Sequence, residues 1–268
     1  MIDQGKRNIL GVLISVIDYA GAVERICQAA RERRSLSVSA LAVHGVMTGV
    51  LDATQRYRLN HLDLVVPDGQ PVRWALNLLH DAGLLDRVYG PTLTLKVCER
   101  AAAEGLPVYF YGSKPEVLEA LATRLQERFP GLKLAGMQPS RFRQLSAAEQ
   151  EQTAEAICAS GAAIVFVGLG CPRQEVWAYE QRDRLPMPIL AVGAAFDFHA
   201  GTLPQAPPAF QRLGLEWLFR LIQEPRRLWR RYAYLNPFYL FLLALQAGRI
   251  TQFDPEFVAV PETELRYG

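Results

Sequence analysis

The sequence of 268 residues is poor in cysteine and histidine and has no long apolar run. Its four cysteines lie far apart without a Cys-x-x-Cys pair, which is typical of reduced thiols rather than of a disulfide framework or a zinc site. No two of its four histidines stand at ligand spacing, so no metal site is expected. No stretch approaches the roughly 18 uninterrupted apolar residues that a spanning helix needs, and the N-terminus lacks the features of a signal peptide. These absences predict a cytoplasmic chain that is soluble or peripheral to a membrane.

Several signatures of known chemistry are also missing. The sequence contains no Asp-x-Asp, with which many sugar-nucleotide enzymes chelate a metal, and no Gly-x-Ser-x-Gly of serine hydrolases. Neither a complete GxGxxG nor a P-loop GxxxxGKS/T is present, so the standard nucleotide fingerprints fail. With 29 Lys and Arg against 27 Asp and Glu, the composition gives no support to a surface that binds polyanions as a whole.

Apolar runs alternate with segments of helical periodicity from residue 8 to about residue 200. The apolar runs predict strands at 8–16, 36–43, 63–66, 107–111, 132–136, 162–167 and 189–192. The periodic segments predict helices at 19–34, 50–60, 70–81, 93–104, 114–129, 146–160 and 174–184. Ser146 and Glu149 are expected to cap the sixth of these helices as a capping box. Strands of continuous apolar character between helices predict an α/β fold, with a Rossmann-like parallel sheet flanked by helices and a small N-terminal lobe.

The composition divides the chain into three parts. Residues 1–204 form the predicted Rossmann-like core. Residues 205–250 are predicted to form a basic, aromatic helical appendage, because seven arginines stand against two glutamates between Ala206 and Arg249, a net charge of +5. Residues 251–268 are expected to form a flexible tail.

The stretch LDLVVPDGQPV places Asp68 on a Pro-Asp-Gly turn directly after a predicted buried strand. Ligands of open parallel sheets bind at the carboxyl ends of the strands, so this carboxylate is a candidate catalytic group. The alternative is a turn aspartate without further function, since Asp before Gly is ordinary in turns.

Two glycine-containing turns are candidates for binding phosphate. In FYGSKPEVLEAL, Gly112 precedes a predicted helix whose N-terminus favours an anion, although most junctions of this kind bind nothing. In FVGLGCPRQEVWA, Gly168 and Gly170 let the backbone approach a ligand, and Arg173 and Gln174 stand at the start of a helix. The second turn suits a diphosphate.

A second carboxylate, Asp197 in AVGAAFDFHAG, follows a predicted strand and a turn of small residues. It could accept hydrogen bonds from both hydroxyls of a ribose. The alternative is a buried aspartate that only caps a helix.

Taken in order, these stretches resemble the WecG/TagA/CpsF glycosyltransferases from about Ile9 to Leu245. The resemblance is carried by PDGQPVRWA, DRVYG, FYGSKPEVLEALATRLQERFPGLKLAG, FVGLGCPRQEVWA, AVGAAFDFHAGTLPQAPP and RLGLEWLFRLIQEPRRLWRRYAYLNPFYL. No single stretch is decisive, but the ordered set is highly specific.

The resemblance implies an inverting, metal-independent transfer that uses no cofactor. The transferred sugar would be N-acetylmannosamine, its uronic acid or glucose, moved from a UDP donor to a prenyl-diphosphate-linked sugar in bacterial cell-surface polysaccharide synthesis. The family's base corresponds to Asp68, and its further motif residues correspond to Arg87, Gln174 and Asp197. The UDP donor is expected at Gly112, Gly168, Gly170, Arg173 and Asp197.

One region departs from the family's pattern. Many members carry a Thr-x-Asn pair at the end of the second long strand, where this chain reads LAVHGVMTG, with His44 and Thr48 as the nearest polar side chains. Because that pair is expected near the transferred sugar or the acceptor, glucose becomes a serious alternative to N-acetylmannosamine as the donor sugar.

The basic appendage has three interpretations. Its arginines and aromatic residues suit a helix in the headgroup layer of an anionic membrane, which predicts a peripheral protein at the inner face of the plasma membrane. The residues expected to contact the membrane or the acceptor diphosphate are Arg226, Arg227, Arg230 and Arg231. The alternatives are a soluble helical cap packed on the core and a nucleic-acid-binding patch, the latter without any recognition motif.

Two other function classes explain the sequence less well than a transferase. A nucleotide-dependent oxidoreductase would leave the Pro-Asp-Gly turn and the basic segment unexplained. A sugar-nucleotide-binding protein without catalysis would lack a base, whereas Asp68 stands in the expected context.

Overall fold

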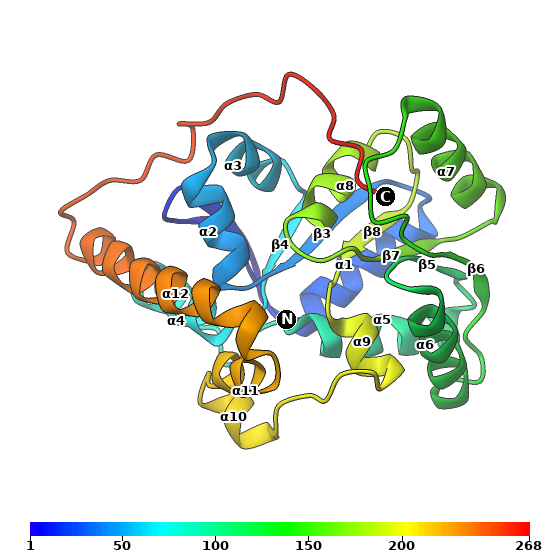
Figure 1. Ribbon diagram of the computed structural model, residues 1–268, viewed down its shortest axis with the longest axis horizontal. Coiled ribbons are helices and arrows are strands. Elements are labelled where there is room, and N and C mark those ends of the chain that lie inside the picture. The colour runs from blue at the N-terminus through cyan, green and yellow to red at the C-terminus, as the bar shows by residue number, and fades with distance from the viewer.

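The structure is a computed structural model that describes residues 1–226, 228–229 and 232–268. Its centre is a six-stranded parallel sheet in the order β4-β3-β8-β7-β5-β6, which confirms the predicted α/β class (Figure 1). The strands are β3 (Leu36–Leu41), β4 (Leu64–Pro67), β5 (Val108–Gly112), β6 (Leu134–Gln138), β7 (Ile164–Gly168) and β8 (Pro188–Ala191).

Helices cover both faces of this sheet, as continuous apolar strands require. One face carries α1 (Tyr19–Arg31), α5 (Gly90–Glu104), α6 (Pro115–Arg128) and α9 (Ala195–Ala200). The other carries α2 (Val43–Leu51), α3 (Ala53–Asn60), α4 (Gln70–His80), α7 (Ala147–Ala159) and α8 (Arg173–Gln181). The predicted capping box of Ser146 and Glu149 is present at the start of α7.

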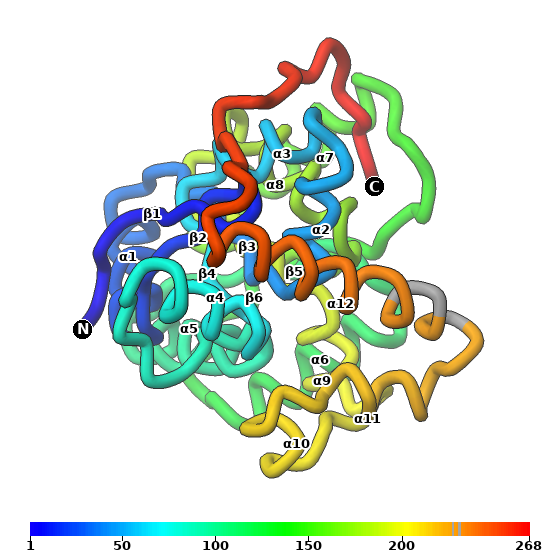
Figure 2. Tube along the Cα trace, turned by 90° about the vertical axis from the view of Figure 1, so that its left-hand side faces the viewer, coloured from blue at the N-terminus to red at the C-terminus, as the bar shows by residue number. Residues whose placement is uncertain are grey.

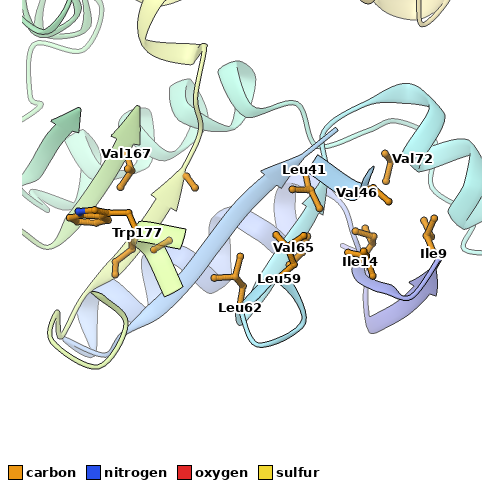
Figure 3. Close-up of a cluster of buried hydrophobic side chains, with 14 of the residues drawn as sticks. Ile9, Ile14, Leu41, Val46, Leu59, Leu62, Val65, Val72, Val167 and Trp177 are labelled. Atoms are coloured by element: carbon orange, nitrogen blue, oxygen red, sulfur yellow. The ribbon is translucent and has the colours of Figure 1, made fainter. Parts of the chain in front are cut away.

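Successive side chains along each strand point to opposite faces of the sheet and pack into two apolar layers. Val165 and Val167 of β7 belong to the layer under α2, α3, α4, α7 and α8, whereas Ile164 and Phe166 belong to the opposite layer. Figure 3 shows the first layer, in which Trp177 of α8 is buried near the strands.

The prediction of one N-terminal strand at residues 8–16 was wrong. The segment is an antiparallel hairpin of β1 (Asp3–Ile9) and β2 (Val12–Ile17) with a two-residue turn. Leu10 and Gly11 both have positive φ, as the tight hairpin turn that fits twisted strands requires. Leucine rarely adopts that conformation, so Leu-Gly is not a typical sequence for this turn, and Gly11 alone did not predict it. The hairpin is the small N-terminal element beside the sheet, and the Ser15 hydroxyl accepts a hydrogen bond from the backbone of Val65 in β4.

The helix predicted near residues 50–60 corresponds to α3 and the last two residues of α2, and the rest of α2 was not predicted as a helix. Asp52 separates α2 from α3, and its carboxylate accepts hydrogen bonds from the backbone N–H groups of Thr54 and Gln55. A capping aspartate of this kind begins a new helix because it satisfies N–H groups of the first turn.

The sheet has a switch point between β3 and β8. These strands are neighbours, yet α2 after β3 and α9 after β8 lie on opposite faces of the sheet. Their connections therefore part at the carboxyl edge and leave a crevice, which is where ligands bind in open α/β sheets.

The segment after α9 forms α10 (Pro208–Arg212), α11 (Glu216–Gln223) and α12 (Pro225–Ala247). In Figures 1 and 2, α10 and α11 lie below the sheet edge and α12 crosses beside α2 and α4. Tyr239 and Leu243 of α12 are buried in the apolar layer of that face, and the Tyr239 hydroxyl donates to the carbonyl of Pro71. The appendage is thus packed on the core along α12.

Residues 251–268 run as an extended segment from the end of α12 past α3 to the vicinity of α7 and α8 (Figure 1). The carboxylate of Glu180 in α8 accepts hydrogen bonds from the backbone N–H groups of Leu265 and Arg266, at 2.6 and 3.0 Å. The N–H of Gly268 donates to the carbonyl of Arg143. These hydrogen bonds attach the end of the segment to the core.

Candidate active site

A cavity of about 1350 Å³ opens at the carboxyl edge of the sheet, over the switch point. Its floor comes from the ends of five strands, and its roof comes from α11 and α12. The floor includes residues 40–45 after β3, 68–71 after β4, 113–114 after β5, 168–171 after β7 and 192–195 after β8. The cavity brings the predicted Asp68, Arg87, Gly168, Gly170, Gln174 and Asp197 together.

Asp68 lies at the end of β4, where the chain leaves the sheet for α4. One of its carboxylate oxygens accepts a hydrogen bond of 2.6 Å from the N–H of Gly90, at the start of α5. Burial raises the pKa of Asp68 to about 6, against the opposing effects of the Arg87 charge and the Gly90 N–H. A carboxylate with a pKa near neutrality can accept a proton from a ligand and remain ionised at rest.

Arg87 is buried in the cavity wall, with only 5% of its side chain exposed. Its guanidinium lies 4.0 Å from the centre of the Tyr89 ring and forms an ion pair with Glu216 of α11. Burial would lower the Arg87 pKa, but the hydrogen bond to Glu216 and the charge of Asp68 outweigh it and raise the pKa. The wall thus holds a permanent cation beside the candidate base.

The glycine turns differ in what they contribute. Gly168 lines the cavity, and a side chain there would collide with the Phe196 ring, since an added Cβ would lie 2.5 Å from it. Gly170 lines the cavity with a φ of +78° and open space around it, so the backbone is accessible. Gly112, with a φ of +106°, packs against the backbone of Gly168 and is not among the described lining residues.

The two adjacent residues at the start of α8, Arg173 and Gln174, lie in different environments. Gln174 lines the cavity and is 3% exposed. Arg173 is exposed and lies outside the described lining, with its guanidinium 5.5 Å from the centre of the Tyr267 ring. The structure therefore does not bring Arg173 to the other predicted donor-binding residues.

Asp197 is the third residue of α9 and lines the cavity. Its carboxylate accepts a hydrogen bond of 3.3 Å from the Thr202 hydroxyl, and its carbonyl accepts from the N–H of Thr202. No backbone N–H of α9 is capped by the Asp197 side chain in the described hydrogen bonds, so the capping alternative gains no support.

Sequence reasoning missed several residues that line the cavity. Lys114 stands in a stretch that was singled out for its glycine, and Arg220 belongs to the basic segment, but neither was assigned to the site. Glu216 had no signal of its own, because only the docking of α11 brings it to Arg87. Tyr89 lies two positions after Arg87, and its ring contacts the Arg87 guanidinium. Three cations, Arg87, Lys114 and Arg220, therefore face one cavity.

The remaining predicted residues differ in where the structure places them. Arg226 is exposed and is not among the described lining residues, and Arg227, Arg230 and Arg231 lie outside the described residues. His44 lines the cavity at the start of α2, whereas the Thr48 hydroxyl donates to the carbonyl of Gly45 within the helix. Of the two polar side chains near the missing Thr-x-Asn pair, His44 is thus the one at the site.

Comparison with known proteins places the chain in one family. The chain matches the glycosyl transferase WecG/TagA/CpsF family over residues 7–252. It is also similar to the N-acetylglucosaminyldiphosphoundecaprenol N-acetyl-beta-D-mannosaminyltransferase of Bacillus spizizenii, with 32% identity over 174 residues. The alignment spans 65% of this chain and 65% of that relative, slightly less than two thirds of each. A match across most of the chain shows that it belongs to the WecG/TagA/CpsF glycosyl transferase family.

Proposed function

We propose that this protein is an inverting, metal-independent glycosyltransferase that moves a sugar from a UDP donor to a prenyl-diphosphate-linked sugar. The observation that carries the proposal is the position of Asp68. It stands at the carboxyl edge of the sheet, in the large cavity, with a pKa raised to about 6 and a buried cation beside it.

Asp68 is the proposed base. An acceptor hydroxyl attacks the anomeric carbon only weakly until a positioned group takes its proton, a contribution of about 10²–10⁴-fold. As the C–O bond to the acceptor forms, the bond from the anomeric carbon to the β-phosphate breaks, UDP leaves, and the proton moves to the Asp68 carboxylate. Attack from the face opposite the leaving UDP inverts the configuration.

The departing diphosphate gains negative charge, which positive groups in a water-poor site stabilise best. Arg87, Lys114 and Arg220 line the cavity and can supply that charge from side chains, in keeping with a metal-independent reaction. The accessible backbone at Gly170 and the start of α8 add N–H groups. Asp197 is the proposed acceptor for the ribose hydroxyls.

The transferred sugar is proposed to be N-acetylmannosamine or glucose. The Bacillus spizizenii relative is named for transfer of N-acetylmannosamine to a diphosphoundecaprenol-linked N-acetylglucosamine. In this chain, Ala40 near the end of β3 and Ala42 and His44 after it line the cavity. This largely apolar stretch keeps glucose as the second candidate.

A lipid-linked acceptor requires the cavity to lie close to a membrane, and we propose docking at the inner face of the plasma membrane. Among the described residues, no helix has the length and apolarity to cross a bilayer. The helices α11 and α12 expose the large apolar side chains Ile222, Trp229, Tyr234, Leu240 and Phe241. Of these, Trp229 and Leu240 also line the cavity. Such side chains beside a basic helix suit the headgroup layer of an anionic membrane.

One experiment tests the function directly. The protein is incubated with UDP-N-acetylmannosamine, UDP-glucose and other UDP-sugars, each with a prenyl-diphosphate-linked N-acetylglucosamine, and the product mass is read. A product heavier by one sugar residue, formed in the presence of a chelator, supports the proposal. UDP binding without product from any donor would favour the alternative of a non-catalytic sugar-nucleotide-binding protein.

A further inference from the structure

Two adjacent polar residues at the start of α8 are almost completely buried. Gln174 is 3% exposed and Glu175 is 1% exposed, and both line the cavity. The Gln174 amide nitrogen donates a hydrogen bond of 2.9 Å to one carboxylate oxygen of Glu175. The Ser39 hydroxyl of β3 donates to the same oxygen at 3.2 Å.

This arrangement decides which end of the Gln174 amide faces the carboxylate. An ionised carboxylate accepts hydrogen bonds and donates none, so only the NH₂ end of the amide can pair with it. Burial raises the Glu175 pKa, and the hydrogen bonds of Gln174, the Glu175 backbone, Ser39 and Cys171 oppose this shift without cancelling it. In the observed hydrogen bond the NH₂ end of the amide faces Glu175, so the carbonyl oxygen of Gln174 lies on the other side.

That carbonyl oxygen lacks a donor. Among the described residues, neither Oε1 of Gln174 nor Oε2 of Glu175 has a hydrogen-bond partner, although both atoms are buried. A buried acceptor without a donor is costly, so a ligand that brings donors is favoured here. Glycine at position 193 leaves space for the Gln174 amide, because a Cβ at that position would lie 3.1 Å from Oε1 of Gln174.

The contacts of Gly90 and Gly193 connect the pair to the candidate base along the carboxyl edge of the sheet. A Cβ built on Gly90 would lie 3.3 Å from an Asp68 oxygen and 3.5 Å from the carbonyl of Val192, and Gly193 comes next in the chain. A hexose whose anomeric carbon lies at Asp68 would therefore extend toward Gln174. Its hydroxyls are donors of the kind that the two orphaned oxygens lack.

We propose that Glu175 is a positioning residue that turns the Gln174 carbonyl toward a hydroxyl of the transferred sugar, so that the pair recognises the sugar and not the diphosphate. The proposal rests on the proposed function for the identity of the ligand. It reassigns Gln174 from a donor that faces phosphate to an acceptor that faces a sugar hydroxyl.

The test measures affinity without turnover. UDP, UDP-glucose, UDP-N-acetylmannosamine and the monodeoxy analogues of both sugars are titrated by calorimetry into the wild type, Gln174→Leu, Glu175→Leu and the double variant. In the wild type, removal of the recognised hydroxyl weakens binding about ten-fold, as expected for one hydrogen bond to a buried acceptor. In all three variants this difference disappears, and UDP itself binds as it does to the wild type.

The double variant shows whether the two residues act as a unit. If Glu175 acts only through Gln174, the double variant loses no more affinity than either single variant. Additive losses, or an equal loss for UDP and UDP-sugar, would overturn the proposal, because they indicate separate contacts or a structural role. Glu175→Gln keeps an oxygen that can accept from Gln174, so it should retain part of the discrimination. Full wild-type discrimination in Glu175→Gln would also count against the proposal, and this variant answers the question if Glu175→Leu does not fold.

Glu180→Gln is the matched control. Glu180 is a second buried glutamate of α8, but it holds the backbone at Leu265 and Arg266 and is not among the described cavity residues. Its replacement should leave the discrimination intact. The calorimetric result is independent of transfer. If the variants still discriminate between the sugars, the role of the pair is refuted. If the wild type discriminates but forms no product, the transferase is refuted.

Discussion

Arg87 and Glu216 stand 129 positions apart in the chain and form an ion pair in the wall of the cavity. The two side chains are 5% and 16% exposed. The pair ties the appendage to the core and gives a buried cation a partner while no diphosphate is bound. A diphosphate that uses Arg87 must share that cation with the carboxylate or displace it.

The Glu216→Gln variant should therefore bind UDP several-fold more tightly than the wild type, because Arg87 no longer has a competing anion. Isothermal titration with UDP measures the change. In an Arg87→Gln background, the same substitution should have no such effect, since there is no cation left to release. Weaker binding by Glu216→Gln would mean that the pair is needed to hold the cavity in shape.

Arg87→Ala should reduce turnover more than donor binding, since the diphosphate gains most of its charge in the transition state. A loss of about 10²–10³-fold in kcat is typical when one such group is removed. The kinetic constants and the Kd for UDP are measured in parallel. Equal losses in both would argue against a role that is specific to the transition state.

Asp68→Asn should abolish transfer and leave UDP binding largely intact. The amide keeps the shape of the side chain but cannot take a proton, so the rate falls by about 10²–10⁴-fold. Product formation by mass spectrometry and UDP affinity by calorimetry check the two halves. Asp81→Asn, an exposed position at the end of α4, serves as the control. Loss of both transfer and UDP binding in Asp68→Asn would indicate a structural role.

The pH profile of transfer should report the ionisation of Asp68. Burial raises its pKa to about 6, and the base works as the carboxylate, so kcat/KM should rise about ten-fold per pH unit below pH 6 and level off above it. Initial rates between pH 4.5 and about 8 show the curve. A flat profile across pH 6 would contradict the assignment.

The same shift predicts how stability varies with pH. A carboxyl group whose pKa is higher in the folded protein than in the unfolded chain binds its proton more tightly when folded. Its contribution to stability is present below pH 3.8 and is lost as the pH rises through about 6. Asp68→Asn removes this penalty, so it should stabilise the protein above pH 6 by up to about 3 kcal/mol. Thermal unfolding of both proteins at pH 4 and about 7.5 should show the gain only at the higher pH.

Membrane docking should depend on the arginines of α12. Changing Arg226, Arg227, Arg230 and Arg231 to glutamate should reduce flotation with vesicles that contain anionic lipid by at least 100-fold, because each basic residue contributes about 1 kcal/mol. A matched variant changes four arginines in or near α1 and α5, on the other face of the sheet, to glutamate, and it should float like the wild type. These arginines are Arg25, Arg31, Arg34 and Arg100. Undiminished flotation of the first variant would leave the soluble cap as the interpretation of the appendage.

Periodicity and local turn chemistry determined most of the architecture. Continuous apolar runs between amphipathic segments can only be buried as strands covered on both faces, so the α/β class and nearly all element positions follow from the sequence. The same local reasoning singled out Asp68, Gly168, Gly170, Gln174 and Asp197, because each follows a strand and the carboxyl ends of parallel strands share one edge. The hairpin turn was not predicted from the sequence, because Leu10 adopts a backbone conformation that its side chain disfavours.

Contacts between distant segments decided the rest. The order of strands places β3 beside β8 and opens the crevice between their connections. The docking of α11 brings Glu216 to Arg87, and the end of the chain places Tyr267 beside Arg173, away from the cavity. None of these relationships has a local signal, because each depends on how surfaces far apart in sequence pack. The sequence by itself determined which residues stand at strand ends, and only the tertiary structure decided which of them face one another.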